Sequence, residues 1–299
     1  MSVAQTRKRD ASTRPTLALS AREKRERSTR MVKSGFAWLI AAVYLFPVYW
    51  MVTTSLKDRA ETFASPPHLV PHSVALDSYR SAFSLEYGVW TALGNSFVIA
   101  LGTLVLTLVV AVPAAYAVAR FRDVVSTSMM VLLTVVQLLP AIAISIPMFV
   151  MFRQMELINT YVSIIIADLS VTLPFAVILL RPYFKQFPYE VEEAAKLDGL
   201  GSISTIIRII IPTIRPGVVM IGSFAFLMAW GEFTFALTLS TQQEIQPLTV
   251  ALNRLIGQYG TNWNQLMAVA TLIATPVLAI FIALQRYIVA GLAGGATKG

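Results

Sequence analysis

The sequence has no cysteine in its 299 residues, so it can form neither disulfide bonds nor thiolate sites. Its only two histidines, His68 and His72, both fall in one predicted loop, which argues against a histidine-based metal site or a Ser-His-Asp triad. Charged residues make up 13% of the chain, about half the usual ~25% of a soluble domain. These shortages exclude thiol chemistry and leave little catalytic material.

Two expected signals are also missing. The sequence contains no G-x-x-x-x-G-K-[ST] phosphate-binding loop, so we expect no ATPase site in this chain. Residues 1–33 are basic and polar, without the apolar segment and cleavage site of a signal peptide. We interpret them as a cytoplasmic tail that touches anionic lipid, with a specific protein partner as the alternative.

What the chain does have is long apolar runs, with 56% hydrophobic residues and a mean hydropathy of +0.66. A helix that crosses a membrane needs about 20 mainly apolar residues. Six segments qualify, at residues 35–55, 96–119, 128–152, 161–180, 217–240 and 266–290. We therefore predict an all-α membrane protein with six transmembrane helices, several of them kinked by internal prolines.

The positive charges indicate how these spans are oriented. With six spans both termini share one side, and that side holds 19 of the 24 lysines and arginines. The positive-inside rule therefore predicts that both termini are cytoplasmic. It also argues against nucleic-acid binding, because the net charge of +8 is distributed as the topology requires.

A polar stretch, "EEAAKLDGLGSISTIIRIIIPTIRPG" at residues 192–217, separates the fourth and fifth spans on the predicted cytoplasmic side. We predict a short helix that starts near Pro188 and ends in a left-handed glycine, Gly199 or Gly201. Ser202 then caps a second, amphipathic helix that lies along the membrane surface. Its apolar face is predicted to consist of Ile203, Ile206, Ile207 and Ile210. The first helix is a compact cytoplasmic knob, either a docking surface or an ordinary structured loop.

This stretch resembles the EAA motif of ABC-importer permeases. The motif has Glu-Ala-Ala, three residues, Gly and, after about nine more, an Ile-Pro pair; the matching residues are Glu193, Ala194, Ala195, Asp198, Gly199, Ile211 and Pro212. "AAYAVARF", "LPFAVILLRPYF", "AWGEFTFALTLS" and "LQRYIVAGLAGGATKG" resemble the carbohydrate branch of this family, and within it the MalG-like rather than the MalF-like half. The resemblance covers the chain from about residue 35 to its end.

The resemblance implies a MetI-like type I importer permease with a cytoplasmic coupling helix at residues 188–201. It also implies four regions: a basic cytoplasmic tail (1–33), a first transmembrane helix with an extracytoplasmic loop (34–90), the permease core (91–286) and a cytoplasmic C-terminal tail (287–299). In this family the Glu-Ala-Ala segment sits in a cleft of the ATPase. That implies an ATPase-coupling role for Glu193, Ala194, Ala195, Asp198 and Gly199.

The implied partners are a second, MalF-like permease, two cytoplasmic ATPase subunits and an extracytoplasmic solute-binding protein. The ATPase would contact the coupling helix and the glycine-rich C-terminal tail. The chain itself is expected to bind no cofactor and no metal, while its ATPase partners use ATP and Mg²⁺. The implied location is the plasma membrane of a bacterium or archaeon.

Polar groups inside spans are expensive and usually face a cavity or a partner helix. Substrate-pathway candidates of this kind are Gln137, Asp168, Thr172, Trp230 and Glu232, and the alternative role for each is helix–helix contact. A self-contained secondary transporter or channel is the other functional hypothesis, although it would need a buried charge pair and internal repeats. An intramembrane enzyme is a third. The solute stays open among oligosaccharides, monosaccharides, polyols and glycerol phosphate.

Overall fold

The structure is a computed structural model that describes residues 21–84, 88–257 and 260–296. The chain divides into two compact units, residues 1–50 and 51–299. Helix α1 (Ala21–Ser55) makes up the described part of the first unit and continues a few residues into the second. It confirms the predicted span at residues 35–55 as a helix. Most of the predicted basic tail, residues 1–20, lies outside the described residues.

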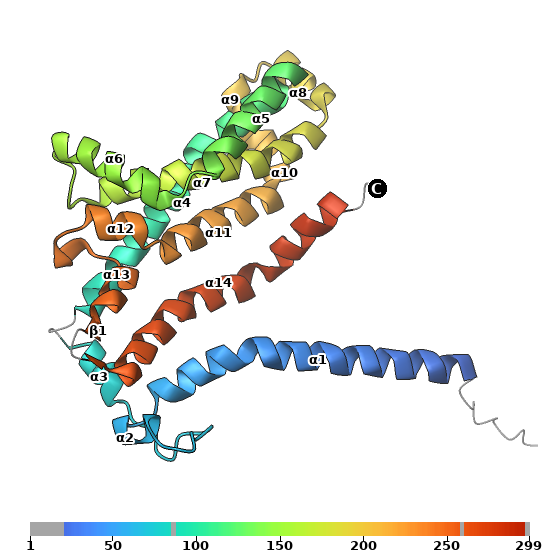
Figure 1. Cartoon of the computed structure of the whole chain (residues 1–299). Helices are drawn as coiled ribbons and strands as arrows, with labels where there is room; N and C mark the ends of the chain where they lie inside the picture. Colours follow the sequence, from blue (N-terminus) through green and yellow to red (C-terminus); the bar gives the residue numbers. More distant parts are fainter. Residues whose placement is uncertain (1–20, 85–87, 258–259, 297–299) are drawn as a thin grey trace, which may run out of the picture. The chain divides into compact units, whose positions relative to one another are not determined.

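The second unit is a set of helices of very different lengths (Figure 1). The long ones are α4 (Val89–Arg120), α7 (Tyr161–Gln186), α11 (Arg215–Gly231) and α14 (Trp263–Ala296). The others are α2 (Arg59–Thr62), α3 (Asp77–Ala82), α5 (Asp123–Gln137), α6 (Ala141–Gln154), α8 (Tyr189–Leu197), α9 (Ser202–Thr205), the π-helical turn η1 (Ile206–Ile210), α10 (Ile211–Thr213), α12 (Thr234–Leu239), the 3₁₀ turn η2 (Gln243–Ile245) and α13 (Leu248–Arg254). A short antiparallel pair, β1 (Ile256–Gly257) and β2 (Gly260–Thr261), precedes α14.

The core lies where α4, α7 and α11 pack against one another. On α4, Ala111, Ala115 and Ala119 are buried at four-residue spacing, which puts a stripe of small side chains on one face. That stripe belongs to the same buried cluster as Leu180 and Phe184 of α7. Small residues let two helix backbones approach closely, and such packing drives helix association in membranes.

Four described helices are long and apolar enough to cross a membrane, and the number rises to six if each of two bent pairs is one span. The predicted span at 128–152 is therefore wrong as a single helix, because α5 and α6 meet there at 90°. Pro140 disfavours helical geometry at the residue before it, and the backbone turns at this point. The predicted span at 217–240 is also broken, since Glu232 is extended between α11 and α12.

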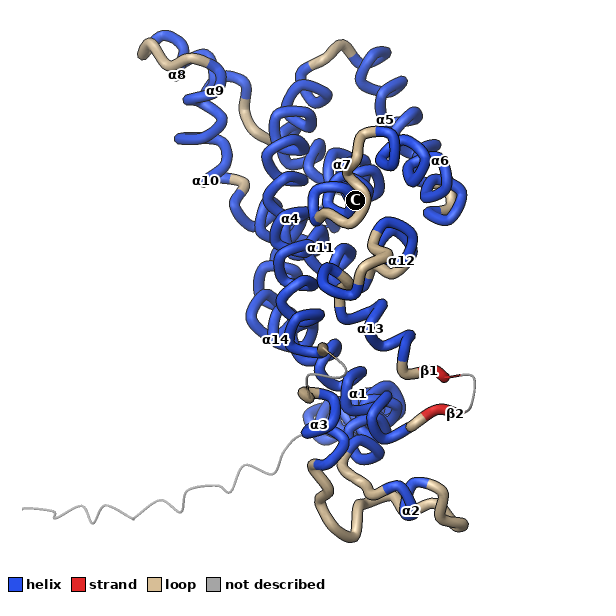
Figure 2. The backbone as a smooth tube through the Cα atoms, turned by 90° about the vertical axis from the view of Figure 1, so that its left-hand side faces the viewer, coloured by secondary structure: helices blue, strands red, loops and turns tan. Residues whose placement is uncertain are grey.

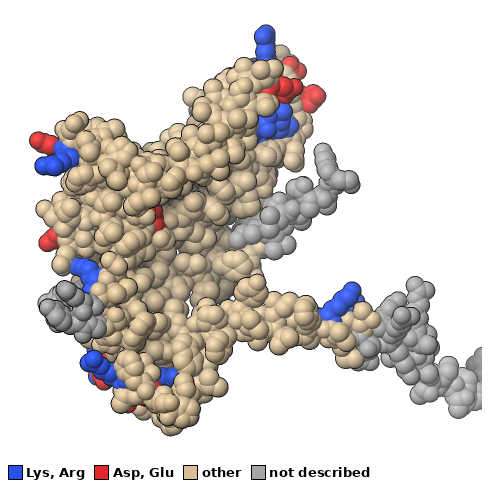
Figure 3. Space-filling view, in the orientation of Figure 1, with Lys and Arg blue, Asp and Glu red and all other residues tan. Residues whose placement is uncertain are grey.

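Contacts between loops agree with the predicted grouping of loops on two sides. In the loops after spans two and four, Lys185 Nζ lies 3.3 Å from Asp123 Oδ1. In the loops after spans three and five, Asn159 Nδ2 donates to Thr241 Oγ1 at 2.9 Å. Figure 3 shows charged side chains gathered in separate patches, with largely uncharged surface between them on the face in view. Which group of loops is cytoplasmic stays a prediction.

Candidate functional site

Helix α8 forms inside the predicted segment 188–201 and lies at one end of the second unit (Figure 2). Pro188 precedes its first helical residue, and its fixed φ suits that position. The helix ends at Leu197, and Gly199, two residues later, has a φ of +84°. The N–H of Leu200 then donates to the Ala195 carbonyl at 2.9 Å. Since this left-handed geometry favours glycine, Gly199 and not Gly201 terminates the helix.

Most of the predicted coupling residues are accessible on α8. The exposed ones are Glu193, Ala194, Asp198 and Gly199, whereas Ala195 is buried. Leu197, which is 89% exposed, follows Glu193 and Ala194 at helical spacing and therefore lies on the same face. The face combines a carboxylate, a small residue and a bare apolar side chain, a composition suited to contact with another protein.

Glu192 is the residue at this site that sequence reasoning missed. Its side chain is 1% exposed and forms an ion pair with Arg120 at the end of α4. Arg120 Nε donates to Glu192 Oε1 at 3.0 Å, and Tyr116 Oη donates to Glu192 Oε2 at 2.8 Å. Arg120 also donates to the Phe187 carbonyl at 3.3 Å. The sequence signal was only an acidic first turn, while the partner lies 72 residues away. Glu192 thus fastens α8 to α4.

The second predicted helix is present over residues 202–213, although its faces differ from the prediction. Ile206 and Ile210 are buried, but Ile203 and Ile207 are 74% and 58% exposed, so the predicted apolar face is wrong. The π-helical turn over Ile206–Ile210 changes the residue period and rotates the following side chains. Ser202 is also the first helical residue and not the predicted cap, which is at Gly201.

Three of the five pathway candidates meet at one cavity of about 90 Å³. Asp168, Thr172 and Glu232 line it, together with Ala141, Val171, Met228, Ala229 and Phe235. Asp168 is 2% exposed; its Oδ2 accepts from Thr103 Oγ1 at 3.3 Å, and its Oδ1 has no hydrogen-bond partner among the described residues. A buried acceptor left unsatisfied is costly and rare. Asp168 is therefore the lining group with the strongest need for a polar partner such as a solute hydroxyl.

Glu232 has a second, structural role at the break between α11 and α12. Its Oε1 accepts from the Phe235 N–H at 2.9 Å, and its Oε2 accepts from the Ala236 N–H at 3.0 Å. These two N–H groups belong to the first turn of α12, where backbone donors have no partner within the helix and a negative charge is favourable. Its carbonyl accepts from Thr249 Oγ1 at 2.8 Å. The carboxylate thus stabilises a broken helix beside the cavity, where non-helical backbone is tolerated inside membranes.

The other two pathway candidates lie outside that cavity lining. Gln137 Nε2 donates to the carbonyl of Val171, itself a lining residue, at 2.6 Å. Trp230 is 2% exposed, stacks on Phe226 with ring centroids 5.6 Å apart, and donates to the Ile273 carbonyl at 3.0 Å. Its satisfied N–H and buried ring are those of a core side chain. The structure therefore brings together the two carboxylates and Thr172, but not the tryptophan.

The broken helices and the small cavity beside them, which three polar and five apolar residues line, can be compared with known proteins. A protein-family profile described as "Binding-protein-dependent transport system inner membrane component" matches residues 108–294, well over half of the chain. The chain belongs to this family. The membership confirms the resemblance to ABC-importer permeases, and it favours a multi-component transporter over a self-contained transporter or channel.

Individual relatives of this inner membrane component cover most of its length. It is 31% identical to the sulfoquinovosyl glycerol transport system permease protein SmoH of Agrobacterium fabrum, over 85% of this chain and 89% of the relative. It is likewise 31% identical to the trehalose transport system permease protein SugB of Mycobacterium tuberculosis, over 87% and 95%. A crystal structure of a bacterial ABC transporter involved in the import of the acidic polysaccharide alginate matches 88% of this chain and 97% of that chain, with a TM-score of 0.74 and 21% identity. That structure confirms the predicted MetI-like permease fold.

Proposed function

We propose that this inner membrane component is one permease subunit of an ATP-driven importer for a sugar or sugar-like solute. The observation that supports this most is α8, which presents Glu193, Ala194 and Leu197 outward while buried Glu192 holds its other face against α4. A projecting helix on a firm base suits the transfer of a partner's motion to the spans. The sugar class follows from SmoH and SugB, whose names specify a sulfoquinovosyl glycerol and trehalose.

The proposed assembly contains a second, MalF-like permease, an ATPase dimer at α8 and a solute-binding protein on the opposite side. This chain is the MalG-like half, with both termini in the cytoplasm and without an ATPase site or cofactor of its own. ATP and Mg²⁺ are used by the ATPase subunits. The described part of the C-terminal tail ends at residue 296, so the proposed ATPase contact of the last residues lies outside the described chain.

For the translocation pathway we assign Asp168, Thr172 and Glu232 to the wall and leave Gln137 as support for the Val171 backbone. Hydrogen-bonding carboxylates and hydroxyls suit the hydroxyl groups of a sugar. The cavity of about 90 Å³ is smaller than the ~300–1,000 Å³ typical of ligand pockets. This supports a pathway that the second permease completes.

The coupling assignment is tested by charge reversal on α8. In a tagged transporter, Glu193→Lys should reduce co-purification of the ATPase and lower solute uptake about tenfold or more, because it places a cation on the docking face. Glu244→Lys is the matched control, since Glu244 is an exposed glutamate in the loop predicted to lie on the other side of the membrane. Full ATPase recovery and full uptake with Glu193→Lys would refute the coupling role of α8.

The solute class is tested separately on the partner binding protein, which should hold most of the selectivity. Titration with a disaccharide, a monosaccharide, a polyol and glycerol phosphate should show binding of one sugar class. Deletion of the permease gene should then abolish uptake of that same solute. Binding of an amino acid or a metal complex in place of any of these would overturn the sugar assignment and leave the permease assignment intact.

A further inference from the structure

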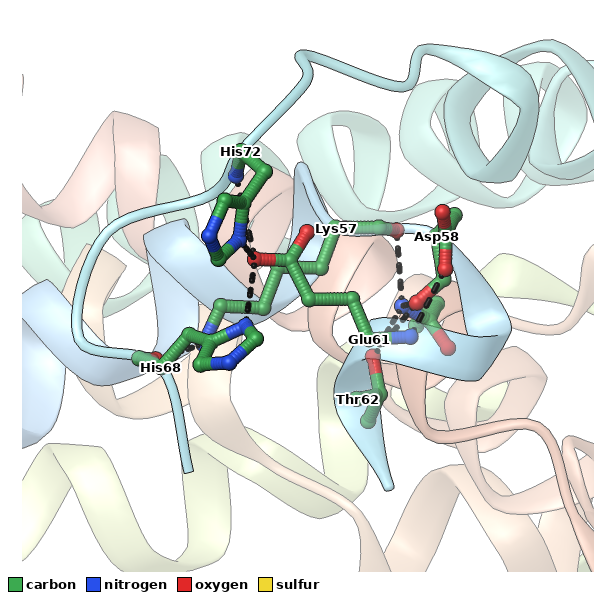
Figure 4. A network of polar contacts seen from close by, with 7 residues as sticks. Lys57, Asp58, Glu61, Thr62, His68 and His72 are labelled. Carbon is green, nitrogen blue, oxygen red and sulfur yellow. Dashed lines mark hydrogen bonds and ion pairs between the residues drawn. The ribbon is translucent and has the colours of Figure 1, made fainter. Parts of the chain in front are cut away.

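The loop after α1 brings together the only two histidines of the chain and a glutamate (Figure 4). Glu61 lies on the short helix α2, and His68 and His72 follow it in the loop toward α3. Glu61 Oε1 is 2.8 Å from His72 Nδ1 and 3.3 Å from His68 Nδ1. The two imidazole rings have centroids 4.2 Å apart. One ligand-type atom from each residue lies within 4.8 Å of the others.

We propose that Glu61, His68 and His72 form a binding site for one Zn²⁺ or a similar first-row divalent cation. A tetrahedral Zn²⁺ with bonds of about 2.0–2.2 Å holds its ligand atoms roughly 3.3 Å apart. The two observed separations from Glu61 Oε1 are 2.8 and 3.3 Å, so small shifts of the side chains would admit the ion. Water would supply the fourth ligand, as in zinc sites with three protein ligands.

The ligand types select the class of cation. Two imidazoles favour zinc, copper or nickel, whereas Mg²⁺ and Ca²⁺ prefer oxygen ligands alone. The absence of cysteine means that no thiolate elsewhere in the chain can compete for the ion. The absence of any third histidine means that no second histidine site can exist.

The short helix α2, which carries Glu61, is held in place by its neighbours. Metal binding therefore has less conformational freedom to remove from this ligand. Asp58 caps α2 by accepting a hydrogen bond from the Glu61 N–H at 2.7 Å. Asn264, at the start of α14, donates to the Lys57 carbonyl at 2.8 Å and to Thr62 Oγ1 at 2.6 Å. The base of the site is therefore tied to a long helix of the same unit.

The charges around the cluster are of both signs, namely the Glu61 carboxylate and the Lys57 ammonium. The Lys57 ammonium donates to the His68 carbonyl. His72 is 71% exposed in its side chain, which leaves an entry path for the ion.

This proposal goes against the expectation of no metal, which rested on two histidines in a loop and did not include Glu61. The competing explanation is simpler: Glu61 accepts hydrogen bonds from both histidines and only closes the loop. If the ion binds, it would cross-link α2 to residues 68–72 and order a surface predicted to be extracytoplasmic. The two explanations differ in whether the cluster binds metal in solution.

The test is titration of the full-length chain, co-expressed with its transporter partners and purified through a tag that contains no histidine. Zinc chloride is added in a buffer without ATP or chelators, and binding is followed by calorimetry. We expect the wild-type complex to bind one more equivalent of zinc than a His68→Ala/His72→Ala complex. Zinc sites on the partner subunits are the same in both complexes, so they cancel in this comparison. Loss of a group that merely orients a ligand weakens metal binding about 10–100-fold, so Glu61→Gln should weaken it at least tenfold.

Asp77→Asn is the matched control, because Asp77 is an exposed carboxylate on α3 in the same predicted loop region. It should leave the zinc affinity unchanged. Cobalt provides a second readout that does not depend on calorimetry, because the visible absorption of bound Co²⁺ should appear in wild type and disappear in His72→Ala. Equal zinc binding by wild type and the double histidine variant, with no cobalt spectrum, would establish the hydrogen-bonded loop and overturn the metal site.

Discussion

Replacing Glu192 by glutamine should loosen α8 from α4 while keeping nearly the same side-chain size. Glu192 is 1% exposed and accepts hydrogen bonds from Arg120 and Tyr116. Hydrogen bonds to charged groups contribute about 1.5–3 kcal/mol and neutral ones about 0.5–1.5. Arg120 is 20% exposed, so we use a value toward the low end of these ranges. A loss of about 1 kcal/mol for each of the two partners gives about 2 kcal/mol in total. That free energy corresponds to roughly a 30-fold larger opening constant for α8.

Amide hydrogen exchange of the peptide that covers residues 189–197, measured in the purified transporter, reports this opening directly. Glu192→Gln should speed exchange in α8 by about that factor and leave α4 and α7 nearly unchanged. Glu190→Gln is the matched control, since it makes the same chemical change two residues away at an exposed position of the same helix. The control should keep wild-type protection in α8.

Equal exchange rates in the two variants would refute the reasoning, because the buried ion pair would then contribute nothing to the position of α8. A second comparison addresses the partner. Arg120→Met alone should be more disruptive than Arg120→Met added to Glu192→Gln, since the single variant leaves a buried carboxylate without its cation. Simple additivity of the two changes would show that the residues do not act as a pair.

Three further outcomes follow from individual positions. Gly199→Ala should lower the stability of the α8 end by about 1–2 kcal/mol. Gly199 has φ +84° and open space where the new methyl group would lie, so the strain would come from the backbone alone. Gly201→Ala, at φ −73°, should change stability little, and equal melting temperatures of the two variants would contradict this. Gly217→Ala would bring a Cβ to 2.8 Å from the Tyr183 ring, so it should reduce the folded yield, and Tyr183→Leu should restore it. Asp168→Asn should preserve assembly but reduce solute uptake; unchanged uptake would remove Asp168 from the pathway.

Four of the six spans could be predicted as continuous helices, because a long apolar run is what a helix needs to cross a membrane. The breaks could not be predicted, because proline does not act in the same way everywhere. Pro113 and Pro174 lie inside the unbroken helices α4 and α7, although Pro113 is exposed and Pro174 is buried. Pro140 begins a turn of 90° between α5 and α6. Pro113 and Pro140 are both exposed, so neither the residue type nor its burial distinguishes the proline inside a helix from the proline at a turn.

The same limit applies to the candidate sites. Helix α8 could be predicted because its residues are neighbours in sequence, but the predicted coupling set included Ala195, which is buried. The Glu192–Arg120 pair joins residues 72 positions apart, and no spacing rule connects them. Asp168 and Glu232 were identified separately as costly polar groups, but only the fold brings both to one cavity. The Glu61 cluster was missed because a loop has no period that would place its side chains together.

Helix α11 links the two candidate sites of the proposed permease. At its start, the chain bends by 90° after residues 202–213, and Ile210 and Ile214 on that side are buried in the core shared with α4 and α7. At its end, Glu232 is extended and lines the cavity. The helix between these breaks has 17 residues and spans about 25 Å. Torsion angles change more readily where the ladder of helical hydrogen bonds is interrupted than in the stiff helix body, although hydrogen bonds from Phe235, Ala236 and Thr249 hold the break at Glu232. A push on α8 would therefore turn α11 as one piece and move Glu232 at the cavity wall.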